Sequence, residues 1–310
     1  MITVGGENLI DYVQTALDGE LPVYKAIPGG SCYNVSIAVA RQDQPVTYVT
    51  PISVDSLGDI LVDRLLADGV KIGSPRSHAP TSLAVVSLSE GQPSYQFYRN
   101  GTAERDISAQ HLDTSIHTLT KIFHIGSLSL IDGEDANLWE CKFKELYQKG
   151  VITSLDPNAR PLVVNARKPY IKRLRRMAKH TCVLKLSDED LEYLCPNLSH
   201  EESVEELFAN SSAQLMILTK GINGATVRTP QHQFNVSAVS AEPFKDAVGA
   251  GDTFMGTILV ELYRRNLKAE NIGRLSLENL QRIVGRATRA AAVNCQFSGC
   301  NPPYARDLKC

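Results

Sequence analysis

The sequence lacks the features that mark membrane, secreted and zinc-binding proteins. No apolar run approaches the roughly 18 residues of a membrane span, and the N-terminus has no basic segment followed by an apolar core. Its seven cysteines are odd in number and none forms a Cys-x-x-Cys pair. We therefore expect a cytoplasmic protein with reduced thiols, without a membrane partner, a disulfide framework or a zinc site.

An excess of charge of one sign is also missing, because 32 Lys and Arg residues stand against 34 Asp and Glu residues. A nucleic-acid partner is therefore not expected, although a balanced total can hide a local patch. Gly5-Gly6 does not lead into a helix as part of a Gly-x-Gly-x-x-Gly turn, which argues against a dinucleotide-binding start. With 310 residues, 43% of them apolar, the chain has enough material for one large α/β core or two small ones.

The clearest chemical signal is Gly-Ala-Gly-Asp at residues 249–252, just before a helix whose apolar residues recur every fourth position at Phe254, Ile258 and Leu262. The small side chains leave the backbone N–H groups of Gly249, Ala250 and Gly251 bare at the helix N-terminus, where the dipole adds positive charge. A phosphate could bind there, and Asp252 could take a proton from a hydroxyl beside it. The same residues could instead form an ordinary strand-to-helix turn with Asp252 as N-cap.

The longer segment 246–256, Asp-Ala-Val-Gly-Ala-Gly-Asp-Thr-Phe-Met-Gly, resembles the C-terminal signature of the ribokinase-like (PfkB-type) carbohydrate kinases. The resemblance implies that Asp252 is the base that deprotonates the sugar hydroxyl. It also implies that the amides of residues 249–251 form the anion hole for the γ-phosphate of ATP.

The segment 28–34, Pro-Gly-Gly-Ser-Cys-Tyr-Asn, resembles the N-terminal signature Gly-Gly-x-x-x-Asn of the same family. By that resemblance Gly29, Gly30 and Asn34 line the sugar pocket. From the residues alone, the glycines could serve close packing and Asn34 could be a polar surface residue.

Three further segments resemble fructokinases in particular. Residues 6–11 match Gly-Glu-x-Leu-Ile-Asp, in which the aspartate, here Asp11, holds the substrate. Residues 97–103 match Phe-Tyr-Arg-x-x-x-Ala, which implies that Arg99 reaches the substrate or its new phosphate. Without the resemblance, Asp11 would be a turn residue and Arg99 a solvated cation on an edge strand.

The third segment, residues 156–160, matches the Asp-x-Asn-x-Arg motif that fructokinases share with ketodeoxygluconate kinases. The resemblance implies that Asn158 and Arg160 face the phosphates or the sugar. An Asp-Pro turn is the alternative interpretation of this segment.

For the nucleotide, the resemblance implies a set of binding residues at the ends of later strands, namely Lys185, Thr219, Gly221, Gly224 and Asn294. Ser187-x-x-Asp190 stands where many relatives have Asn-x-x-Glu, so we expect Asp190 to join the magnesium shell through water. Asp246 and the loop after Asn294 are expected to hold a potassium-like ion.

From residue 121 onward strands and helices alternate, with strands expected at 122–126 and 151–156 and a helix at 133–149. This alternation predicts a parallel sheet with ligands at the carboxyl ends of its strands. The strongest β signal lies at 81–99, with Gln92-Pro93 as the turn of a hairpin. Residues 2–11 predict a strand, a glycine turn and a second, short strand.

Together with the resemblance, these elements predict one ribokinase-like domain spanning residues 1–310. It would be a three-layer α/β/α sandwich with a mostly parallel central sheet and a small β-sheet lid made from residues 11–27 and 81–100. The exposed apolar faces of such a lid also predict a homodimer.

The predicted activity is transfer of the γ-phosphate of ATP, with Mg²⁺, to a primary hydroxyl of a small sugar, with fructose favoured. A 2-keto-3-deoxygluconate kinase is the close alternative, because an acid sugar would pair with Arg99 and Arg160. An aminoimidazole riboside kinase shares much of the pattern. A catalytically idle sugar- or nucleotide-binding homologue belongs to another class, and a nicotinamide oxidoreductase is the remaining alternative.

Overall fold

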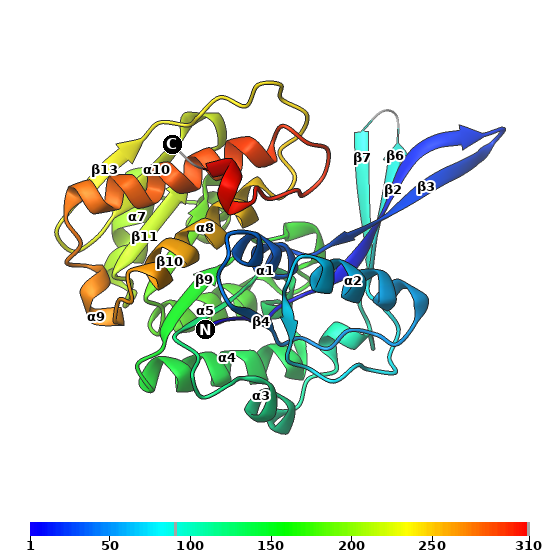
Figure 1. Ribbon diagram of the computed structural model, residues 1–310, viewed down its shortest axis with the longest axis horizontal. Helices are drawn as coiled ribbons and strands as arrows, with labels where there is room; N and C mark the ends of the chain where they lie inside the picture. Colours follow the sequence, from blue (N-terminus) through cyan, green and yellow to red (C-terminus); the bar gives the residue numbers. More distant parts are fainter. Residues whose placement is uncertain (90–91, 309–310) are drawn as a thin grey trace.

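In the computed structural model of the protein, residues 1–89 and 92–308 are described. Their main feature is a nine-stranded sheet with the strand order β13-β12-β11-β10-β9-β8-β1-β4-β5 (Figure 1). Its strands are β1 (Ile2–Val4), β4 (Val46–Tyr48), β5 (Lys71–Ile72), β8 (Ile122–Gly126), β9 (Ile152–Asp156), β10 (Val183–Ser187), β11 (Leu215–Thr219), β12 (Ala225–Arg228) and β13 (Gln233–Val236). All neighbours pair in parallel except the β11–β12 and β12–β13 pairs.

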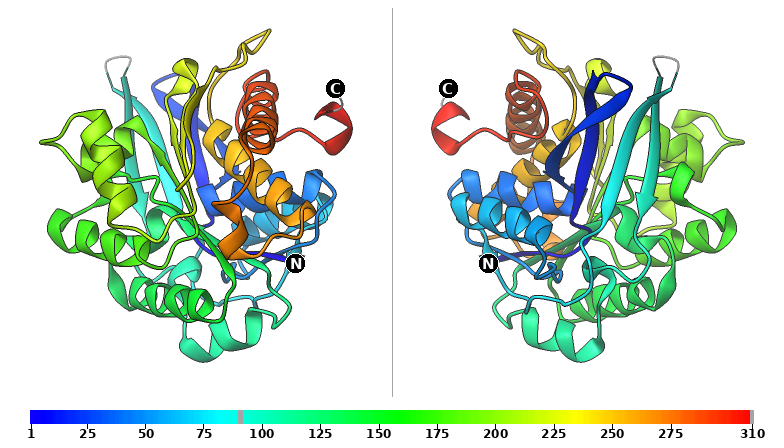
Figure 2. Two further views of the ribbon diagram at one scale, coloured as in Figure 1. Left: turned by 90° about the vertical axis from the view of Figure 1, so that its left-hand side faces the viewer. Right: turned by 90° about the vertical axis from the view of Figure 1, so that its right-hand side faces the viewer.

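Helices cover both faces of this sheet, which confirms the predicted three-layer α/β/α sandwich (Figure 2). One face carries α1 (Ser31–Arg41), α2 (Ser56–Ala67), α8 (Ala250–Arg264), α9 (Ala269–Ile272) and α10 (Leu277–Asn294). The other carries α3 (Ala109–Ser115), α4 (Gly133–Gln148), α5 (Arg167–Ala178), α6 (Asp188–Leu194) and α7 (His200–Ala209). Each face has its own apolar core because a parallel sheet must be covered on both sides. None of the helices in the described part of the chain could cross a membrane.

A second sheet of four strands projects from the body of the protein (Figure 1). Its order is β3-β2-β6-β7, with β2 at Leu9–Asp18, β3 at Leu21–Gly29, β6 at Leu83–Ser89 and β7 at Gln92–Tyr98. The prediction of a short second strand near residue 11 is wrong, because β2 continues to Asp18. Pairing with β3 as far as Asp18 opposite Leu21 supports this length.

Gln92 and Pro93, predicted as a hairpin turn, instead begin β7, where Pro93 pairs with Leu88 of β6. Residues 90 and 91, between β6 and β7, lie outside the described residues. β7 is an edge strand, and an edge strand tolerates proline because one side of its backbone needs no ladder hydrogen bond.

The core between the sheet and α4 provides a test of packing. Phe143 is fully buried and its ring centroid lies 6.3 Å from that of Phe123. Phe143→Ala should lower the free energy of unfolding by about 3–5 kcal/mol, since it removes a large buried side chain and leaves a cavity. Leu119→Ala is the control, because Leu119 is 67% exposed. Urea unfolding measures both, and equal losses would contradict this packing.

Candidate active site

Asp252 lies in the first turn of α8 and is buried, with 8% of its surface exposed. Its Oδ1 accepts a hydrogen bond of 2.6 Å from the Ser31 hydroxyl, and its Oδ2 accepts one of 2.8 Å from Asn34 Nδ2. Ser31 and Asn34 both belong to α1, so two segments 221 residues apart in the chain meet at this carboxylate. Burial raises the pKa of Asp252, and the two hydrogen bonds oppose that shift.

The turn before α8 adopts a backbone conformation that favours glycine. Gly249 is the N-cap at φ 74°, a left-handed conformation, and a Cβ there would lie 2.3 Å from Cys300 Sγ. The Ala250 amide donates to the Ala247 carbonyl at 3.1 Å and so closes the turn. Within the described residues, the amides of Gly249 and Gly251 have no acceptor and remain available to an anion.

A buried cation lies beside this turn. Lys185 of β10 is close to Gly251, since a Cβ on that glycine would lie 3.5 Å from Lys185 Nζ. Lys185 Nζ pairs with Asp156 Oδ2 at 2.7 Å, and both side chains are buried. Burial alone would lower the pKa of Lys185, but the carboxylates of Asp156, Asp190 and Asp252 raise it. Lys185 therefore stays protonated next to the bare amides.

Asp156 at the end of β9 belongs to this buried cluster, and the sequence prediction did not single it out. Its Oδ1 is buried and has no hydrogen-bond partner among the described residues. The signal was present, because Asp156 opens the Asp-x-Asn-x-Arg motif, but the motif itself does not indicate a pair with Lys185.

Asp190 holds the loop after β9 in place through hydrogen bonds. Its Oδ1 accepts from the Ala159 amide at 2.6 Å, while its Oδ2 accepts from the amide and hydroxyl of Ser187, each at 2.8 Å. Ser187 caps α6 in return, as its spacing predicted. Asn158 in this loop has a positive φ of 39°. Three of the roughly four acceptor sites of the Asp190 carboxylate are therefore occupied by the protein.

Asp11 of the small sheet and Arg160, which follows a strand of the central sheet, were both predicted to line the site, and their charges interact. Asp11 of β2 is partly buried, and burial raises its pKa to about 6 while the positive charge of Arg160 opposes that rise. Arg160 follows β9, is exposed and donates to the carbonyls of Asn158 and Ala159.

The two glycines before α1 leave room for their neighbours. A Cβ on Gly29 would lie 2.3 Å from Asp11 Oδ2, and one on Gly30 would lie 2.5 Å from the Glu7 carbonyl oxygen. Gly30 is the N-cap of α1 at φ 116°. The Asp11 side chain and the Glu7 backbone can approach the start of α1 this closely only because Gly29 and Gly30 lack a side chain.

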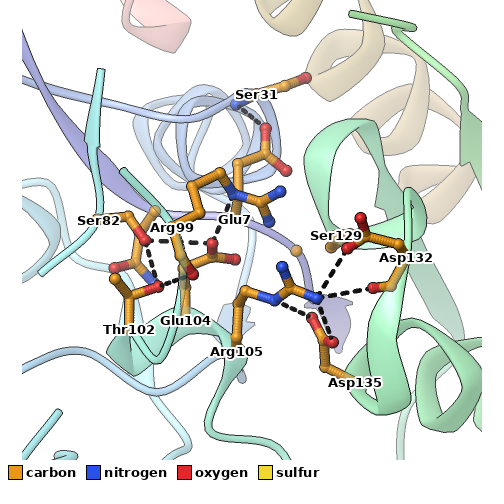
Figure 3. A network of polar contacts seen from close by, with 12 residues as sticks. Glu7, Ser31, Ser82, Arg99, Thr102, Glu104, Arg105, Ser129, Asp132 and Asp135 are labelled. Atoms are coloured by element: carbon orange, nitrogen blue, oxygen red, sulfur yellow. Dashed lines mark hydrogen bonds and ion pairs between the residues drawn. The ribbon is translucent and has the colours of Figure 1, made fainter. Parts of the chain in front are cut away.

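Arg99, at the end of β7, is in a buried ion pair. Its Nε donates to Glu104 Oε1 at 2.8 Å, and the arginine and glutamate side chains are 6% and 1% exposed. Glu7 lies on the other side of the guanidinium (Figure 3). Glu7 Oε1 accepts from the Ser31 amide at 2.7 Å, and burial raises the pKa of Glu7 to about 7.

Neither Glu7 nor Glu104 was among the sequence-predicted site residues. Glu7 stands within the fructokinase-like segment 6–11 and Glu104 directly follows the segment 97–103. The signal in both cases is an acidic residue next to a matched motif, and only the three-dimensional arrangement shows that both acids face one arginine.

The predicted nucleotide residues lie at the ends of β10 and β11 and in the following turns. The Thr219 hydroxyl donates to the Leu186 carbonyl at 3.2 Å. Gly221 and Gly224 have φ values of 51° and 82°, and a Cβ on Gly224 would lie 2.0 Å from the Val236 carbonyl oxygen. Position 224 therefore requires glycine, whereas the left-handed φ of Gly221 only favours it.

Asn294 is fully buried at the end of α10 and connects two loops. Its Nδ2 donates to the Val248 carbonyl at 2.7 Å, and its Oδ1 accepts from the Asn301 amide at 2.8 Å. Asp246 connects the same loops, since its carboxylate accepts from the amides of Val248 at 2.9 Å and Gly299 at 2.8 Å. The loops at 246–248 and 294–301 thus lie side by side.

A cluster of protein metal ligands is not evident at this edge of the sheet. Among the described residues, no group of three or more His, Cys, Asp or Glu side chains could hold a metal ion.

Comparison with known proteins identifies the family. The model of the pfkB family carbohydrate kinases matches residues 2–306. A fructokinase of Rhizobium leguminosarum bv. trifolii is 33% identical over 271 residues, covering 86% of this chain and 81% of the relative. Fructokinase-2 of Solanum lycopersicum is 31% identical over 284 residues, covering 89% and 85%.

Among solved structures, a fructokinase with bound ATP from Xylella fastidiosa superposes with a TM-score of 0.87 at 26% identity, covering 99% of this chain and 96% of that chain. Fold, site and relatives agree. The chain belongs to the PfkB family of carbohydrate kinases and is an ATP-dependent phosphotransferase.

Proposed function

We propose that this protein is a fructokinase, which transfers the γ-phosphate of ATP to a primary hydroxyl of fructose. The observation that carries the choice of a neutral sugar is the buried pair of Arg99 and Glu104, with Glu7 beside it. An acid sugar such as 2-keto-3-deoxygluconate needs a free cation, but Arg99 is already neutralised, and the charge of Arg160 already acts on Asp11. A second anion would then be buried without compensation, which is costly.

The cleft beneath the small sheet supports the same choice. Its walls include Phe97, Arg99, Ile131, Val163 and Asn165. Arg105 and Asp132 also line the cleft, but they pair with each other as Arg99 pairs with Glu104, so apolar surface and an amide remain for a neutral polyhydroxy ligand. The relatives named above are fructokinases, and an aminoimidazole riboside remains the alternative neutral acceptor.

Asp252 would act as the general base. Its raised pKa increases its proton affinity, and its hydrogen bonds from Ser31 and Asn34 fix the direction of the carboxylate. The bare amides of Gly249 and Gly251, the N-terminus of α8 and protonated Lys185 would take up the charge that develops on the transferred phosphoryl group.

The acceptor sugar would be held from two sides. Asp11 from the small sheet can accept hydrogen bonds from two neighbouring hydroxyls, and Arg160 faces it from the main sheet. Gly29, Gly30 and Asn34 would complete the pocket next to the base. Closure of the small sheet over this pocket would keep water from becoming the acceptor.

The residues fit a magnesium–nucleotide complex with few direct protein ligands. Mg²⁺ neutralises the β- and γ-phosphates when bound, and Asp190 would reach it through water because its own acceptor sites are mostly occupied. Thr219, Gly221, Gly224 and Asn294 would shape the nucleotide side. Asp246, which joins the 246–248 and 294–301 loops, would hold a potassium-like ion near their carbonyl oxygens.

We further propose that residues 1–310 form one kinase domain whose lid, made from residues 11–27 and 81–100, is also a dimer interface. Four large apolar side chains on β2, β3 and β7 are exposed, namely Leu17 at 63%, Leu21 at 72%, Val23 at 42% and Tyr98 at 51%. An apolar surface on a small projecting sheet is typical of an interface.

The base assignment and the substrate can be tested together. The assay measures magnesium- and ATP-dependent ADP release with fructose, 2-keto-3-deoxygluconate, ribose, adenosine and aminoimidazole riboside, each in KCl and in NaCl. We expect the highest rate with fructose. Asp252→Asn should lower kcat by at least about 10²-fold because it removes the general base. Asp113→Asn, a change at an exposed acid on α3, is the matched control.

Highest turnover on 2-keto-3-deoxygluconate or the riboside would contradict the fructose assignment. An Asp252→Asn variant as active as Asp113→Asn would contradict the base. Binding of ATP without turnover of any acceptor would favour a catalytically idle homologue.

A pH profile tests the role of Asp11. Below a pKa of about 6 the carboxyl is protonated and loses acceptor capacity, so kcat/KM for fructose should fall as the pH decreases through 6. Asp252 must also be deprotonated to act as the base, so kcat/KM should fall more steeply with decreasing pH than one titrating group alone would produce. Asp11→Asn should lower kcat/KM at pH 8 and reduce that slope, and an unchanged slope would exclude Asp11 as its cause.

Light scattering after size exclusion tests the dimer. The wild type should elute at twice the 34.0 kDa of one chain. Leu21→Ser combined with Val23→Ser should shift the mass towards one chain, since the change removes apolar contact area. A wild-type mass of one chain would show that these side chains do not form a dimer interface.

A further inference from the structure

We propose that Glu7 is a positioning residue that transmits the position of the small sheet, through Arg99, to Ser31 and thereby to the base Asp252. This inference rests on the proposed phosphoryl transfer and adds a role for a residue that does not touch the reacting atoms. It predicts that closure of the small sheet and alignment of the base are coupled.

The coupling follows two sets of buried hydrogen bonds, which are separated only between Glu7 and Arg99. Asp252 Oδ1 accepts from the Ser31 hydroxyl at 2.6 Å, and the Ser31 amide donates to Glu7 Oε1 at 2.7 Å. Arg99 lies on the other side of Glu7, and its Nε donates to Glu104 Oε1 at 2.8 Å. Glu7 is 1% exposed, so solvent does not screen its interaction with the guanidinium.

The step between Glu7 and Arg99 is the one that can change. Glu7 Oε2 and Arg99 Nη2 are both buried, and neither has a hydrogen-bond partner among the described residues. One is an acceptor and the other a donor, and the two side chains are neighbours in Figure 3. A displacement that brings these two atoms together would therefore give each a charged hydrogen-bond partner.

The two side chains belong to different segments of the chain. Arg99 directly follows β7, the edge strand of the projecting small sheet. Glu7 lies between β1 of the central sheet and β2, next to the N-terminus of α1. Closure of the small sheet would therefore change the distance from Arg99 to Glu7 before it changes anything at Asp252.

The electrostatics are consistent with such a role. Burial and the neighbouring charge of Glu104 raise the pKa of Glu7 to about 7, while Arg99 and the amides around Ser31 oppose the rise. A single guanidinium thus faces two carboxylates, and it cannot compensate both fully. Its position decides which of the two carboxylates it stabilises more.

A purely structural role is the alternative, because Glu7 also caps α1. Gly30, the N-cap, has no side chain, and Glu7 supplies the acceptor for the first amide of the helix. Glu7→Gln separates the two roles. The amide oxygen of glutamine can still accept from the Ser31 amide, while the negative charge that attracts Arg99 is lost.

The test is a double-mutant cycle on the full-length protein, with Glu7→Gln, Ser31→Ala and their combination. Glu7→Gln should lower kcat about tenfold, a coupling of the size seen between contacting groups, with KM for ATP unchanged. In the Ser31→Ala background, where the bond to Asp252 is absent, the same change should lower kcat less than about twofold. The unfolding temperature is measured for each variant.

The matched control is Glu140→Gln, the same change at a partly buried acid that pairs with Arg173 and Arg176 far from Ser31. Glu140→Gln should leave kcat unchanged. It should also leave unchanged the factor by which Ser31→Ala lowers kcat. Multiplicative losses of kcat for Glu7→Gln and Ser31→Ala, or a loss of stability alone, would overturn the positioning role.

The sugar panel separates this result from the proposed function. Turnover by the wild type with multiplicative losses overturns the role of Glu7 alone. No turnover by the wild type on any acceptor overturns both proposals.

Discussion

The hydrogen bonds from Ser31 and Asn34 to Asp252 are the interactions on which the site depends. They join α1, which follows the small sheet, to α8, which carries the glycine turn. The two helices also pack against each other along their apolar sides, and Gly256 allows the close approach, since a Cβ there would lie 2.7 Å from Ala38 Cβ. The geometry of the carboxylate is thus set by the packing of helices.

Around this carboxylate the site is arranged by charge. Lys185 and the bare amides are positive, Asp156, Asp190 and Asp252 are negative, and all of the acids but one have their oxygens hydrogen-bonded. Burial makes each of these charges strong because water screens them little. Three carboxylates thus outnumber the one lysine, so the cation that accompanies an incoming polyphosphate also offsets negative charge of the protein.

Much of the architecture was predictable because its signals are local. The strand–helix–strand pattern over residues 122–156 follows from the spacing of apolar residues and from the turn residues between the elements. The length of β2 and the place of Pro93 in β7 were not predictable, since both depend on which strands become neighbours or edges.

The site shows the same limit. Short motifs indicated Asp252 and the glycines, but pairs such as Lys185 with Asp156 and Arg99 with Glu104 become visible only once the strands and loops that carry them are placed together. Pro93 has a consequence of another kind. Because it removes an N–H from the outer strand β7, it makes that side of the projecting sheet a poor template for strand addition, and so protects a protein with an exposed sheet against aggregation through that edge.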